Sequence, residues 1–144
     1  MKKLLLILLY IPLFGVSQIP LPISPSSNII DDKLSLETGC VFGDCENGIG
    51  KYVFEDGDTY IGEWKYGMKH GNGIKIYGGK FHGDKYVGEW KDIWQDGYGT
   101  FIRDNGDQYV GEFKRGTYHG RGTYITFEGK VYEGLWENGK FIGE

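Results

Sequence analysis

The feature that most constrains this fold is a five-residue phrase, tyrosine–any residue–glycine–glutamate–tryptophan, which recurs along the chain. Four copies occur, some with substitutions: Tyr60–Trp64, Tyr86–Trp90, Tyr109–Phe113 and Tyr132–Trp136. Their tyrosines are 26, 23 and 23 residues apart, and a glycine pair such as Gly71/Gly73 begins seven residues after each of the first three copies. A fixed period in this range marks a repeat array. The sequence therefore predicts a surface built by stacking small units.

The glycine pair, a short strand, a turn and the phrase together resemble the MORN (membrane occupation and recognition nexus) repeat. The resemblance covers residues 43–144 and implies an elongated antiparallel sheet of stacked hairpins that binds or scaffolds without catalysis. The chain departs from the pattern in three ways. Phe113 replaces tryptophan in the third copy, Glu133 and Leu135 stand in the fourth where the others carry Ile or Val and then Glu, and the second copy has three extra residues before Tyr86.

Each repeat has the pattern of a β-hairpin. In the third copy, residues 100–103 and 108–114 are predicted strands, and Asn105-Gly106 between them supplies the positive φ angles that a tight turn requires. The matching segment of the second copy, residues 78–84, is longer and predicts a larger loop. The predicted fold is all-β: an elongated single-layer twisted antiparallel sheet of about four stacked β-hairpins, or about eight strands spanning ~38 Å. It covers residues 39–144, with a partial C-terminal cap.

Side chains along a strand alternate between the two faces of a sheet. The tyrosine, glycine and tryptophan of each phrase therefore share one face, and we expect the sheet to bend toward it because glycine removes bulk between the rings. These aromatics form either a packed core, since each buries ~150–250 Å², or the lining of a concave binding groove. Packing is the favoured interpretation, with residues at the rim serving both. The candidate ladder residues are Tyr60, Trp64, Tyr86, Trp90, Tyr109, Phe113, Tyr132 and Trp136.

No residue pattern predicts a catalytic, cofactor or metal site. The glutamates Glu63, Glu89 and Glu112 form a row with neighbours ~9–10 Å apart, which exceeds the ~5–5.5 Å of a retaining glycosidase pair. A lysine follows each on the same face, so we interpret the row as a solvated charge ladder. His70 and His119 hold equivalent places ~19 Å apart and cannot share an ion at metal–nitrogen distances of ~2 Å. Solvent-edge or turn roles are predicted for them.

The N-terminal residues are typical of a secretory signal: Lys2-Lys3, an apolar run over residues 4–14, and small residues up to Ser17. The run is shorter than the ~20 residues of a membrane-spanning helix. We predict a signal peptide over residues 1–17, cleaved before Gln18, and its brevity is typical of bacteria; a retained anchor is the alternative. Residues 18–38, which contain proline and serine, are predicted to form a flexible tether.

The net charge indicates which partners are disfavoured, and the cysteine pair indicates the compartment of the protein. Without residues 1–17 the chain has 14 basic and 20 acidic residues, a net charge of −6, which disfavours nucleic acid and anionic bilayers. Cys40 and Cys45 fit a secreted or periplasmic chain with one disulfide. In an extended strand they would lie ~16 Å apart, beyond the ~7 Å limit, so the bridge requires a turn at residues 42–44. A metal pair and two free thiols are the alternatives.

These features predict an exported, non-catalytic module that presents its concave groove to another protein of the cell envelope, with no cofactor. Two alternatives belong to other classes. The family name implies binding of lipid head groups at a membrane surface, and an aromatic ladder is also suited to carbohydrate. Liposome sedimentation at several salt concentrations and a glycan array would separate the three.

Overall fold

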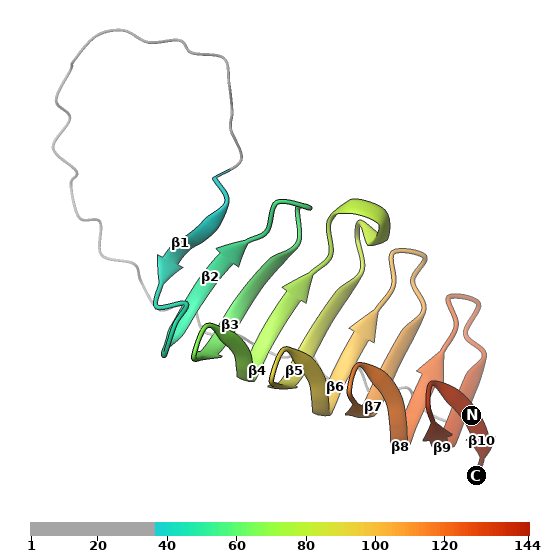
Figure 1. Ribbon diagram of the computed structural model, residues 1–144. Coiled ribbons are helices and arrows are strands. Elements are labelled where there is room, and N and C mark those ends of the chain that lie inside the picture. Colours follow the sequence, from blue (N-terminus) through green and yellow to red (C-terminus); the bar gives the residue numbers. More distant parts are fainter. Residues whose placement is uncertain (1–36) are drawn as a thin grey trace, which may run out of the picture. The chain divides into compact units, whose positions relative to one another are not determined.

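The computed structural model describes residues 37–144, which form one open antiparallel sheet of ten strands in chain order (Figure 1). The strands are β1 (Gly39–Gly43), β2 (Ile49–Val53), β3 (Thr59–Lys65), β4 (Met68–Ile76), β5 (Lys85–Lys91), β6 (Trp94–Ile102), β7 (Gln108–Lys114), β8 (Thr117–Ile125), β9 (Val131–Glu137) and β10 (Lys140–Gly143). The predicted all-β sheet of stacked hairpins is confirmed. The predicted signal peptide, its cleavage between Ser17 and Gln18, and nearly all of the tether lie outside the described residues.

Two strands were not foreseen. The four predicted hairpins are β2–β3, β4–β5, β6–β7 and β8–β9, and the additional strands lie at the two ends of the sheet. β1 pairs with β2, and β10 pairs with β9. Each outer strand satisfies backbone N–H and C=O groups that a terminal hairpin would leave open. The predicted C-terminal cap is therefore a paired strand.

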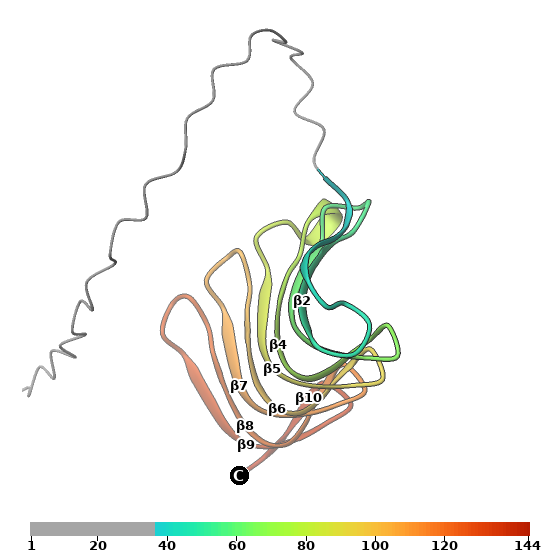
Figure 2. The same cartoon turned by 90° about the vertical axis from the view of Figure 1, so that its left-hand side faces the viewer.

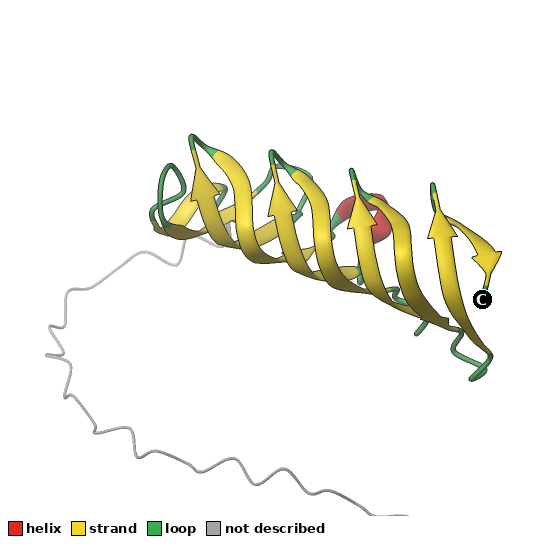
Figure 3. Ribbon diagram, turned by 90° about the horizontal axis from the view of Figure 1, so that it is seen from below, coloured by secondary structure: helices red, strands yellow, loops and turns green. Residues whose placement is uncertain are grey.

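The strands are connected along two opposite edges of the sheet. The hairpin-loop rim consists of residues 54–58, 77–84, 103–107 and 126–130. Its second loop contains the 3-10 helix η1 (Gly79–Phe81), drawn red in Figure 3, and is the enlarged loop that the sequence predicted. The turn rim consists of the β1–β2 turn and of four two-residue turns in which both residues have positive φ, as tight hairpin turns require. These turns are Tyr66-Gly67, Asp92-Ile93, Arg115-Gly116 and Asn138-Gly139.

The strands bend so that the sheet forms a trough between its two rims (Figure 2). The aromatic residues of the four phrases lie on the inner face. A single-layer sheet has no second layer to cover them, so they are buried by the curvature of the sheet and by other side chains of the same face. The outer face carries half-exposed aliphatic side chains, among them Ile61, Ile74 and Val87.

Candidate binding groove

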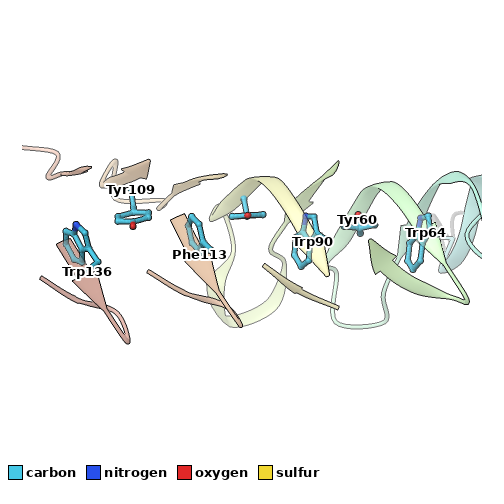
Figure 4. Close-up of a cluster of buried hydrophobic side chains, with 7 residues drawn as sticks. Tyr60, Trp64, Trp90, Tyr109, Phe113 and Trp136 are labelled. Carbon is cyan, nitrogen blue, oxygen red and sulfur yellow. The ribbon is translucent and has the colours of Figure 1, made fainter. Parts of the chain in front are cut away.

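The phrases build a continuous aromatic ladder along the floor of the trough (Figure 4). Each of the first three tyrosines packs edge-to-face against the aromatic end of its own phrase and of the next: the Tyr60 ring lies 5.0 Å from Trp64 and 5.3 Å from Trp90. Seven of the eight predicted ladder residues are at most 8% exposed, and Tyr132, in the last copy, is partly buried. The ladder is thus the hydrophobic core of the array, and its rings offer little surface to a ligand.

The tyrosine hydroxyls explain the glycines between them. The Tyr109 hydroxyl shares its one proton between the Glu112 and His119 carbonyls, at 3.0 and 3.2 Å. Its ring lies across Gly111 and Gly122, where a Cβ atom would overlap the hydroxyl. Burial raises the pKa of Tyr109 to about 12, so this hydroxyl remains a neutral donor.

The tryptophans are also fixed by hydrogen bonds to glycine backbone. Trp64 donates its indole N–H to the Gly50 carbonyl at 3.1 Å. Trp90 and Trp136 donate the same hydrogen bond to the glycine carbonyls at the equivalent places farther along the chain. Phe113 has no N–H group, so the Gly99 carbonyl, at the equivalent place, receives no indole hydrogen bond.

The glutamates of the row are exposed, as a solvated charge ladder requires, and each also clamps a backbone N–H group of the next strand. The β3–β4 register shifts between Gly62 and Glu63, and Gly71 adopts a φ of +54° opposite the shift. The Glu63 carboxylate accepts the Asn72 N–H at 2.8 Å and fills the space where a Cβ of Gly71 would lie. Glu89 and Glu112 make the same bond, each at 2.8 Å. No glutamate–lysine ion pair occurs within residues 37–144.

The structure places both histidines in strands, which excludes the turn role of the two roles predicted. His70 and His119 lie, partly buried, within β4 and β8, opposite Glu63 and Glu112. No cluster of three metal-ligating side chains occurs in the part of the chain that the structure describes.

A second set of bonds, which sequence reasoning missed, joins consecutive loops of the hairpin-loop rim. Asp58 accepts the Gly78 N–H at 2.8 Å, and Asp84 accepts the Asp104 N–H at 2.9 Å. Asp107 likewise accepts from the following loop, at 3.0 Å. The available signal was an aspartate two residues before each of the first three ladder tyrosines. These staples fix the spacing of the loops above the groove.

The accessible lining of the trough lies above the ladder, and we call it the groove layer. It consists of partly exposed or exposed side chains of the inner face: Phe54, Lys69, Tyr77, Phe101, Arg103, Tyr118 and Tyr124. The Lys69 ammonium lies 5.3 Å from the Phe54 ring and 5.5 Å from the Trp90 ring, and burial lowers its pKa. These residues lie outside the repeated phrase, and their chemistry varies between copies. The period therefore did not reveal them.

A family model for the MORN repeat matches residues 46–59, 60–79, 86–108, 109–130 and 132–143. The chain belongs to the MORN repeat family. The last four matches each begin at a ladder tyrosine. A MORN unit therefore begins with the five-residue phrase and continues through the turn after it to the following glycine pair. The family is generally non-catalytic. A search of curated proteins finds no match. Within residues 37–144, no helix has the length and apolar character needed to cross a membrane.

A disulfide closes the N-terminal end of the MORN array. Cys40 and Cys45 are bonded, with their Cα atoms 5.9 Å apart, which excludes the free-thiol and metal-pair alternatives. The turn lies at residues 45–48, not at 42–44, because β1 continues to Gly43 before the chain reverses. The Cys45 sulfur lies over Gly50, much as tyrosine hydroxyls lie over the glycines of later repeats. The disulfide therefore takes the place of a first tyrosine rung.

Proposed function

We propose that this MORN array is an exported, non-catalytic module that binds another protein in its trough. The observation that carries the proposal is the groove layer, an accessible aromatic and basic surface held on a fully packed floor. Interface hot spots are enriched in aromatic residues and arginine, and they depend on a rigid, well-packed surround. The ladder supports this surface from below, and most of its rings are buried beneath the groove layer.

Export is supported by two independent features. The N-terminal residues have the composition of a secretory signal. The Cys40–Cys45 disulfide is of the kind that persists in oxidising compartments. We therefore propose a secreted or cell-envelope location, and a partner in the same compartment.

The surface chemistry favours a protein over a lipid or a sugar. Residues 37–144 carry 13 basic and 18 acidic side chains, a net charge of −5, which is unfavourable on an anionic bilayer. A sugar would need the exposed faces of several aromatic rings in a row, and the rings that form a continuous row are the buried ones. The groove layer instead mixes aromatic, cationic and polar groups along the trough.

Site-specific photo-crosslinking in the producing organism tests the proposal. A photoreactive phenylalanine analogue is placed at Phe54, on the inner face, and at Ile74, on the outer face, as the matched control. We expect a discrete protein adduct from Phe54 and none from Ile74, with the adduct identified by mass spectrometry. Adducts from Ile74 alone would place the partner on the outer face. Liposome co-sedimentation or a glycan-array signal without any protein adduct would support one of the other ligand classes instead.

A further inference from the structure

We propose that the trough contains a pocket for one aromatic side chain of an acidic segment of the partner protein, at the rung where phenylalanine replaces tryptophan. The inference rests on the proposed function and names the anchor of the same groove. Its starting point is Phe113, the one interior ladder position that departs from tryptophan.

The shorter side chain leaves a gap in the groove layer. At two tryptophan rungs the indole reaches the aromatic residue above it: Trp64 lies 5.8 Å from Tyr52, and Trp136 lies 6.0 Å from Tyr124. Phe101 occupies the corresponding place above Phe113, but these two rings form no such pair. A cavity of about 260 Å³ lies there instead. Its lining includes Phe101, Phe113, Tyr118, Gln95, Arg103 and Thr117.

The size and walls of this cavity suit a single aromatic side chain. Pockets for drug-sized ligands are about 300–1,000 Å³, so this one is too small for most free ligands of that class. Three of its lining residues are aromatic, and aromatic rings pair edge-to-face at centroid distances of about 4.5–7 Å. Phe113 already contacts Tyr118 in this way, at 5.5 Å. A ring inserted from a partner would continue the same packing.

The charges around the pocket indicate an acidic partner. The only ion pair among residues 37–144 joins Lys75 to Asp58, so Arg103, the one charged side chain of the pocket lining, has no carboxylate within ion-pair distance. The nearby rim aspartates Asp84 and Asp107 already accept backbone N–H groups of the next loops. Arginine pairs well with carboxylates because its planar group donates two parallel hydrogen bonds. A partner carboxylate beside the inserted ring therefore complements Arg103.

In the test, the full chain is titrated with two small probes, N-acetyl-L-phenylalanine and its uncharged primary amide. Binding is monitored by the NMR signals of the backbone amides. We expect the carboxylate probe to shift signals of Phe101, Thr117 and Tyr118, and to bind more tightly than the amide. Phe113→Trp fills the pocket with an indole. Binding of the carboxylate probe should weaken about tenfold or more, because the loss of one apolar contact has an effect of this size. The melting temperature of this variant should stay the same or rise, because the indole regains the glycine carbonyl.

Arg103→Gln should reduce binding of the carboxylate probe to the level of the amide. Equal binding of the two probes by the unmodified chain would overturn the acidic element. Absence of these shifts, or their persistence in Phe113→Trp, would overturn the pocket.

The partner itself decides whether the pocket is used. In the crosslinking assay, Phe113→Trp should abolish the protein adduct formed from Phe54. An undiminished adduct would overturn the anchor pocket while leaving the groove function intact, whereas absence of any adduct in the parent chain counts against the groove function itself. Self-association of the chain that Phe113→Trp abolishes would assign the pocket to a second copy and overturn the separate partner.

Discussion

Replacing Gly111 by alanine should strongly destabilise the sheet, although it adds one methyl group. A Cβ atom there would lie 2.5 Å from the Gly122 Cα, 2.6 Å from the Arg121 carbonyl oxygen and 2.9 Å from the Tyr109 hydroxyl. Ordinary carbon contacts are about 3.5–4.0 Å, so β7 and β8 must separate by about 1 Å at this pair. Overpacking costs about 1–3 kcal/mol, and we expect the upper end because two of the three neighbours are backbone atoms.

Thermal unfolding followed by circular dichroism measures this effect. For a domain of this size, about 3 kcal/mol corresponds to a melting temperature roughly 12–24 °C lower. Gly129→Ala is the first control: its φ is +86° but nothing lies within 4 Å of the added methyl, so it shows only the backbone cost of about 1–2 kcal/mol. Val110→Ile, on the outer face, should change stability by less than about 0.5 kcal/mol. Equal melting temperatures for the Gly111 and Val110 variants would refute the assignment of faces.

Three further predictions concern other parts of the chain. Glu112→Ala should cost about 1–2 kcal/mol in urea unfolding, because the Arg121 N–H loses its acceptor; an equal loss in Glu137→Ala, an exposed glutamate, would contradict the clamp. Ile93→Gly should stabilise by about 1 kcal/mol, because a β-branched residue at a φ of +75° bears a left-handed strain that glycine lacks; a lower melting temperature would count against this. Mass spectrometry of the exported protein should find Gln18 as its first residue, and a mature pool that retains Met1 would disprove cleavage.

The fold was predictable because two periods in the sequence agree. The 23-residue repeat gave the number of hairpins, and the alternation within each phrase gave the inner and outer faces. The role of Glu63 was not predictable in this way, because it depends on a register shift between β3 and β4. Alternation along one strand carries no information about the backbone groups that a neighbouring strand leaves unpaired. The groove layer escaped prediction for a related reason: Lys69 and Tyr118 hold equivalent places but share no chemistry.

The departures from the repeat are of two kinds: those in the fourth copy, and Phe113 in the third. In the fourth copy, Leu135 replaces the clamping glutamate and Lys130 the stapling aspartate. In the other copies these groups act on the repeat that follows, and within residues 37–144 the strand that follows Leu135 is β10, which carries only Gly143 of a glycine pair. Phe113 differs because repeats lie on both sides of it and the Gly99 carbonyl is in place for an indole. Packing alone would favour tryptophan there, and the gap that phenylalanine leaves is the feature of the array that most directly points to a bound partner.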